Sequence, residues 1–137
     1  LNLTNLAENF NTSELIDNCL SKNHKKTVNI LNENNYSSDD AILIIKTLLN
    51  RSKRLLELKR KSELNKNLEE CISSHKPPIF WKEKEIVKQQ MNNWSLKNIE
   101  NLIYEINEIE LLTKKNSSSS LNIISDFLIN QSSKLSN

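Results

Sequence analysis

Glycine is absent from all 137 residues of the chain, and this absence limits the fold more than any other feature of the sequence. A chain of this length would ordinarily hold roughly ten Gly residues. Tight β-hairpin turns place residues at positive φ, which only Gly adopts without steric cost, so such hairpins are hard to build here. We expect Asn or Asp at any position that needs positive φ. The Gly-rich loops that bind phosphates and dinucleotides are excluded for the same reason.

Apolar residues instead recur at intervals of three and four, the pattern of helices with one buried face. The longest predicted helix begins at Asp39, after the capping candidates Ser37 and Ser38, and breaks near Asn65. The most regular one follows an N-cap at Ser95 and extends to Leu112. The buried stripe predicted for the longest helix consists of Ile42, Ile45, Leu48, Leu49, Ser52, Leu55 and Leu56.

The remaining helices are predicted to be shorter. Thr12 or Ser13 is expected to cap a helix that ends near Leu20, and residues 3–8 are expected to be the tail of a preceding helix. Further helices are predicted over residues 25–34, over 68–72 after a cap at Asn67, over 86–94, and from 121 to 135, with a flexible linker at 117–120. Pro77 and Pro78 require a non-helical turn. The fold class is therefore all-α, a compact bundle of about six to seven helices.

The residues that usually carry chemistry are sparse. Cys19 and Cys71 are far apart and match no metal or redox spacing, so we interpret them as reduced, partly buried thiols. His24 and His75 lie in polar segments where exposure is expected, without the companions that a zinc site needs. No apolar run approaches the ~18 residues of a membrane span. We therefore predict no enzyme, no metal, no cofactor and no membrane association, and an intracellular, cytoplasmic location.

Positive charge is concentrated in one part of the predicted long helix. The net charge of the chain is only +2, yet residues 46–61 carry seven bases and one acid, Glu57. Lys46, Lys53 and Arg60 are seven residues apart and share one stripe. Two interpretations stay open: a solvated helix face, or a surface that meets phosphates or an acidic partner.

An aromatic turn is the most unusual local feature. Pro77 and Pro78 are followed by Ile79, Phe80 and Trp81, and then by Lys82 and Lys84. One hypothesis is that both rings fill the core where a loop crosses the bundle. The other is that Trp81 is exposed and stacks on a nucleobase beside the two lysines, as aromatic side chains do in single-strand binding proteins.

The order of these features resembles a known family. The string Ser13–Asp17, the long helix from Ala41 to Leu56, the turn Lys76–Lys82 and the segment Trp94–Leu96 resemble the C-terminal domain of the delta subunit of bacterial DNA polymerase III, a clamp-loader subunit, in its alphaproteobacterial branch. The resemblance extends from about Asn11 to the end. Residues 1–10 would then be the tail of the preceding lid domain, and 11–137 the helical collar domain. A chain that begins at Leu1 rather than Met is expected to be a piece of a longer protein.

The resemblance implies a function in assembly. In that family the third domains of five subunits form a ring-shaped collar, the clamp-opening element lies in a separate N-terminal domain, and the delta subunit is not an ATPase. Partners would be the tau/gamma and delta-prime subunits, primer–template DNA, and the sliding clamp through the absent domain. An aromatic residue at the position of Trp81 faces DNA in relatives. The Ser117–Ser120 stretch lacks the aromatic and Gly residues of some relatives, so no contact is assigned there.

Collar contacts are expected on the exposed faces of the two longest helices, one basic and one acidic, because opposite charges suit pairing between neighbours around a ring. The expected residues are Lys46, Lys53, Arg54, Arg60, Glu100, Glu105 and Glu108. Two other functions remain open. One is a free-standing nucleic-acid-binding domain that uses the basic helix 46–61 and Trp81. The other is a helical adaptor unrelated to replication.

Overall fold

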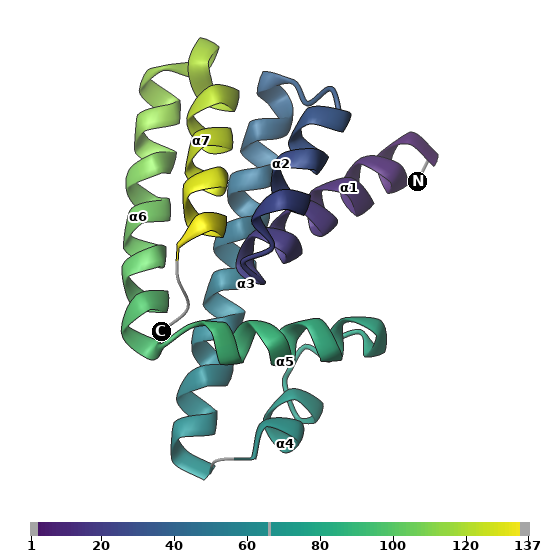
Figure 1. The fold of residues 1–137 in the computed structure, drawn as a ribbon, viewed down its shortest axis with the longest axis vertical. Helices are drawn as coiled ribbons and strands as arrows, with labels where there is room; N and C mark the ends of the chain where they lie inside the picture. Colours follow the sequence, from purple (N-terminus) through teal and green to yellow (C-terminus); the bar gives the residue numbers. More distant parts are fainter. Residues whose placement is uncertain (1–2, 66, 135–137) are drawn as a thin grey trace.

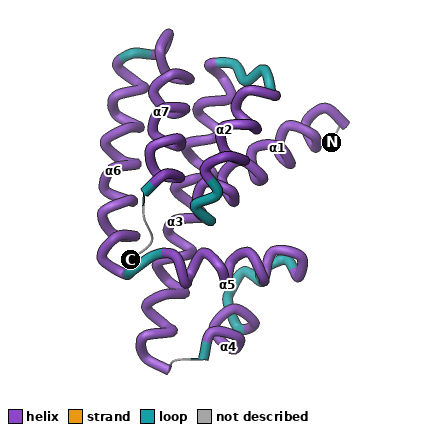
Figure 2. The backbone as a smooth tube through the Cα atoms, in the orientation of Figure 1, coloured by secondary structure: helices purple, strands orange, loops and turns teal. Residues whose placement is uncertain are grey.

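The computed structural model describes residues 3–65 and 67–134, and side chains from Asn11 onward apart from residue 65. This part of the chain is all-α, as predicted, and contains no β-strand. Figure 2 shows how completely helices account for the backbone, with only short loops between them. The elements in chain order are α1 (Leu3–Leu20), α2 (His24–Glu33), α3 (Ser38–Asn65), α4 (Leu68–Ser73), the 3₁₀ turn η1 (Trp81–Glu83), α5 (Lys84–Asn93), α6 (Leu96–Lys115), the 3₁₀ turn η2 (Ser117–Ser119) and α7 (Ser120–Ser133).

Helix α3 is the central element of the bundle. It packs against α1, α4, α5, α6 and α7, and α6 runs antiparallel beside it (Figure 1). Helix α5 crosses the lower half of α3, with α4 below it. Leu48, Leu55 and Leu58 lie on the core side of α3 and are almost fully buried. They pack in one hydrophobic cluster with residues of every other α-helix, including Val87 and Met91 of α5.

Side-chain caps fix several helix boundaries where the sequence predicts them. Ser37 and Asp40 form a reciprocal pair, in which the Ser37 N–H donates to the Asp40 carboxylate at 2.7 Å and the Asp40 N–H donates to Ser37 Oγ at 3.4 Å. Asn67 caps α4 by accepting from the Glu70 N–H, and Ser95 caps α6 by accepting from the Asn98 N–H. The predicted break near Asn65 is confirmed.

The turn after α1 shows how the chain manages without Gly. Lys22 adopts φ +62°, and its N–H donates to the Cys19 carbonyl while the Asn23 N–H donates to the Asn18 carbonyl. This hydrogen-bond pattern is the Schellman C-cap, in which Gly is the usual left-handed residue. The expectation that Asn or Asp takes such positions is wrong here, because Lys22 is the non-Gly residue with positive φ in the described chain.

Other sequence expectations are also wrong. Helix α1 is continuous from Leu3 to Leu20, so Thr12 and Ser13 do not start a helix; Thr12 is buried, and Ser13 bonds to α3. Ile42, placed in the buried stripe of α3, is 58% exposed, and Leu112 at the end of α6 is 44% exposed. The Ser117–Ser120 stretch is not a flexible linker, because it forms η2 and the buried first residue of α7. Leu135, expected in the last helix, lies outside the described residues.

Candidate interaction site around the Phe80–Lys82 turn

The aromatic turn projects from the helical body. Phe80 is 55% exposed and Trp81 is 69% exposed, and their ring centroids lie 5.9 Å apart in a tilted pair. Lys82 Nζ lies 5.4 Å from the centroid of the Trp81 ring, within the range of a cation–π contact. The hypothesis that both rings fill the core is wrong, because Ile79 takes the buried position at this turn and Val87 and Met91 of α5 continue the core.

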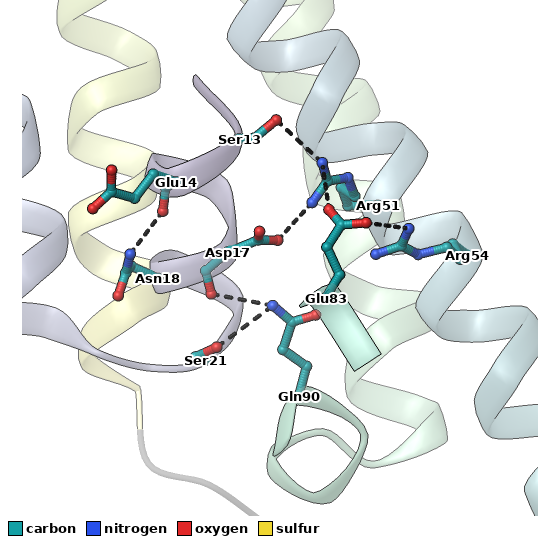
Figure 3. A network of polar contacts seen from close by, with 9 residues as sticks. All are labelled: Ser13, Glu14, Asp17, Asn18, Ser21, Arg51, Arg54, Glu83 and Gln90. Carbon is teal, nitrogen blue, oxygen red and sulfur yellow. Dashed lines mark hydrogen bonds and ion pairs between the residues drawn. The ribbon is translucent and has the colours of Figure 1, made fainter. Parts of the chain in front are cut away.

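A network of four charged side chains anchors this turn to the bundle (Figure 3). Arg51 of α3 donates to the Asp17 carboxylate of α1 at 2.6 Å and lies 3.3 Å from the Glu83 carboxylate of η1. Glu83 also lies 3.9 Å from Arg54, one turn further along α3. Glu83 is the last residue of η1, only two positions after Trp81. The network therefore joins the base of the aromatic turn to two helices.

Burial shapes the electrostatics of this network. Burial raises the pKa of Asp17 above its ordinary value, and the attraction of Arg51 opposes that rise without cancelling it. Burial also lowers the pKa of Arg54, together with repulsion from Arg51. The two arginines thus lie close enough to destabilise one another. Glu83 lies between their guanidinium groups, and its negative charge compensates both.

Two uncharged contacts complete the attachment of α5 to α1. Gln90 Nε2 donates to the Asp17 carbonyl at 3.1 Å, and Trp94 Nε1 donates to the Leu20 carbonyl at 2.7 Å. Both side chains are nearly fully buried. The Leu20 carbonyl lies at the C-terminal end of α1, where intrahelical donors run out, and the Asp17 carbonyl accepts from Gln90 in addition to the Ser21 N–H. The four-charge network at Glu83 and these two bonds thus attach η1 and α5 to the bundle.

A groove lies beside the turn, between α1 and the η1–α5 segment. Its volume is about 520 Å³. Phe80 and Ile86 supply its apolar lining, and Glu14 and Lys26, which pair at 3.7 Å, lie along its α1–α2 side. Lys82 lines this groove and also a shallower hollow over α5. The exposed Trp81 ring, the Phe80 ring and the Lys82 ammonium therefore form one surface suited to a flat, apolar group that carries negative charge nearby.

The predicted DNA-contact residues are only partly brought together. Trp81 and Lys82 are exposed and adjacent, as described above. Lys84, by contrast, is the first residue of α5 and is half-buried. Whether any of the three contacts DNA stays a prediction.

The predicted collar residues fall into two groups. Lys46, Lys53 and Glu108 are exposed. Arg54, however, is only 19% exposed and contacts Glu83, so it belongs to the internal network rather than to a free face. Arg60 pairs with Glu100 at 3.8 Å, and Glu105 accepts from Gln131 at 2.8 Å and lies 3.8 Å from Lys134. One of these ion pairs, Arg60–Glu100, therefore joins the basic and acidic helices, whereas Glu105 contacts Gln131 of α7 and Lys134.

His75 is another residue that the sequence misplaces. It is 4% exposed rather than solvated, whereas His24 is exposed as expected. The His75 Nδ1–H donates to the Pro77 carbonyl at 2.9 Å, and Nε2 lies 3.4 Å from the Glu57 carboxylate of α3. A carbonyl only accepts, which assigns the hydrogen to Nδ1. His75 thus bonds within its own Pro77–Pro78 segment, and its buried Nε2 faces Glu57 of α3 without a hydrogen-bond partner in the described structure.

The described residues contain no group of three or more His, Cys, Asp or Glu side chains placed to hold a metal ion. No helix in this part of the chain is long and apolar enough to cross a membrane. Comparisons with protein-family models, with curated proteins and with solved structures found no match. A function for the chain therefore has to be argued from its surfaces.

Proposed function

We propose that this chain is the collar domain of a clamp-loader delta subunit, a non-catalytic module that helps to assemble the complex that loads a sliding clamp onto primed DNA. The observation that carries the proposal is the exposed aromatic turn. The ordered sequence resemblance implies that an aromatic side chain at this position faces DNA, and Trp81 is exposed where a core residue would be buried.

The way this turn is held supports a binding function. Exposed aromatic rings beside cations are typical of single-stranded nucleic-acid-binding surfaces, and Phe80, Trp81 and Lys82 form such a group. Here the four-charge network fixes the backbone beneath Trp81, so little ordering entropy would be lost on binding. Trp81 would stack on a base near the primer–template junction, with Lys82 and Lys84 near the phosphates.

The partners follow from the same proposal. The tau/gamma and delta-prime collar domains would bind the helical body, primer–template DNA would meet the Trp81 turn inside the assembly, and the sliding clamp would contact a separate N-terminal domain. The module would act in the cytoplasm, where replication takes place in bacteria.

Size-exclusion chromatography tests the assembly function. The chain is mixed with the C-terminal domains of the tau/gamma and delta-prime subunits of the same organism, each shown to be folded by circular dichroism. The proposal predicts elution as one defined complex. Separate elution of folded components at micromolar concentration would reject it.

The exposure of Trp81 also favours a second candidate, a free-standing single-strand-binding domain. That candidate predicts that the isolated chain binds DNA and that this affinity falls steeply as the salt concentration rises. It also predicts that Trp81→Ala costs about 1–3 kcal/mol of binding free energy for each base that stacks on the ring. The collar proposal predicts that the isolated chain binds DNA weakly, and that Trp81→Ala weakens primed-DNA binding only by the assembled loader. Fluorescence anisotropy with the same labelled primed DNA separates the two.

A further inference from the structure

A small cavity lies where the turn after α1, the first half of α6 and the end of α7 meet. Its volume is about 170 Å³. Cavities for drug-sized ligands measure roughly 300–1,000 Å³, so this one suits a single small ion or functional group. Helix α7 runs antiparallel to α6 in Figure 1, which brings the end of α7 beside the first half of α6. The polar lining consists of Lys22, Asn98, Asn101, Glu105, Gln131 and Lys134.

Lys22 reaches this cavity from an unfavourable backbone conformation. It adopts φ +62°, which Gly takes without steric cost and a residue with a Cβ does not. In this conformation Lys22 Nζ lies 4.2 Å from the centroid of the Trp94 ring, within the range of a cation–π contact. Residues held in sparsely populated backbone conformations cluster at functional sites. The conformation of Lys22 therefore directs attention to the cavity that its side chain lines.

Lys134, which follows α7, brings a second ammonium group to the cavity. Burial lowers the pKa of Lys22, and repulsion by Lys134 lowers it further. The two cations therefore lie close enough to disfavour each other. The acid of the cavity is Glu105, which accepts from Gln131 at 2.8 Å and lies 3.8 Å from Lys134. With two ammonium groups and one carboxylate, the lining keeps a net positive charge.

Two neutral donors lie beside these cations. Asn98 and Asn101 are three residues apart on α6, so both side-chain amides lie on the face that lines the cavity. Neither amide makes a hydrogen bond within the described part of the chain. Trp94 lines the cavity as well, and its Nε1–H is already used by the Leu20 carbonyl. The cavity thus offers ammonium and amide donors beside an aromatic ring.

We propose that this cavity binds one phosphate group. Lys22 and Lys134 would supply the charge, and the Asn98 and Asn101 amides would donate to further oxygens. A phosphate group carries close to two negative charges and three or more acceptor oxygens, so it uses more of these donors than a carboxylate does. Its charge would also relieve the repulsion between the two lysines. The inference does not depend on the proposed collar function.

A fluorescence titration of the full chain tests the cavity. The chain has two Trp residues, so a Trp81→Phe background leaves the Trp94 ring as the reporter. The titrants are sodium phosphate and glycerol phosphate, a monoester, each compared with sodium chloride at the same ionic strength. Three variants change the lining: Lys22→Gly, whose backbone suits positive φ, Lys134→Gln and Glu105→Gln. The matched control is Lys25→Gln, at an exposed position on α2, and circular dichroism checks that every variant is folded.

The inference predicts a saturable response to phosphate with a Kd of about 1 mM or lower, and none to chloride. Lys22→Gly and Lys134→Gln should each weaken binding at least about tenfold, whereas Glu105→Gln should tighten it about threefold, because it removes a like charge. The control should stay within about twofold of the background. Saturation by inorganic phosphate alone would assign the free ion, and saturation by the monoester would assign a phosphate carried by a larger molecule.

Three results would overturn the inference. The first is the absence of a saturable response to both phosphate compounds. The second is a response that chloride reproduces at the same ionic strength. The third is an affinity that the three cavity variants leave equal to that of the control, because the phosphate would then bind elsewhere on the chain.

Discussion

Replacing Glu83 by Gln removes the negative charge that lies between two arginines and keeps the shape of the side chain. The substitution breaks the ion pairs from Glu83 to Arg51 at 3.3 Å and to Arg54 at 3.9 Å. It also leaves the two guanidinium groups to repel each other, and burial together with this repulsion already lowers the pKa of Arg54. Glu83→Gln should therefore destabilise the fold and loosen η1.

The magnitude follows from burial. Exposed ion pairs contribute about 0–1 kcal/mol, and removing one partner of a buried pair costs about 3–5 kcal/mol. The three side chains are 17–24% exposed, and Arg51 keeps its bond to Asp17, so the cost lies near the low end of this span. We expect a loss of about 1.5 kcal/mol in the free energy of unfolding. At an unfolding entropy of about 0.3 kcal/mol per kelvin for this chain length, the melting temperature should fall by about 5 °C.

Urea denaturation and thermal melting, both followed by circular dichroism, measure these losses. Glu85→Gln is the matched control, because Glu85 lies two residues later, is exposed and is not part of the network. A Glu83→Gln variant as stable as both the wild type and this control would refute the reasoning, because the network would then contribute nothing to the attachment of the aromatic turn.

Three further predictions follow from single buried groups. Ser52 is fully buried, and its hydroxyl has no hydrogen-bond partner in the described structure. Ser52→Ala should therefore raise the free energy of unfolding, measured by urea denaturation, by about 1 kcal/mol. A loss of stability would show that the hydroxyl does have a hydrogen-bond partner. Burial raises the pKa of Cys19 to about 12, so this thiol should resist a disulfide reagent at neutral pH until the chain is unfolded in guanidinium. Rapid labelling of Cys19 in a folded Cys71→Ala variant would contradict this prediction. Burial raises the pKa of Asp17 in the folded chain above its ordinary value of 3.8, so the folded chain holds this proton more tightly than the unfolded chain does. The stability that results is fully present below pH 3.8 and is lost as pH rises through the folded-state pKa. The free energy of unfolding of the wild type, relative to Asp17→Asn, should therefore fall as pH rises from about 4, and a rise over that range would contradict the assignment.

The sequence predicts most of the helical framework because the signals that set it are local. Ser95 and Asn67 each bond to a backbone N–H three residues away, so a cap can be recognised without knowledge of the tertiary fold. The same rule misplaces the start of α1. Thr12 and Ser13 look like caps in the sequence, but their side chains contribute to packing and to a bond with α3 inside a continuous helix.

The candidate site is predicted only in part, because its anchoring is non-local. Asp17 and Arg51 are 34 residues apart in sequence, and nothing in either segment marks them as partners of Glu83. Trp81 can be located as an unusual residue, but its exposure depends on Ile79 filling the core in its place. His75 is misplaced for a similar reason, since its polar neighbours do not reveal the carbonyl and the carboxylate that accompany its burial.

The mass of the reconstituted assembly tests the central claim most directly. Native mass spectrometry of this chain mixed with the tau/gamma and delta-prime collar domains should show one dominant five-subunit species that contains a single copy of this chain. A spectrum that shows only the free chain, beside partner domains that assemble without it, would contradict the proposed function as a clamp-loader collar domain.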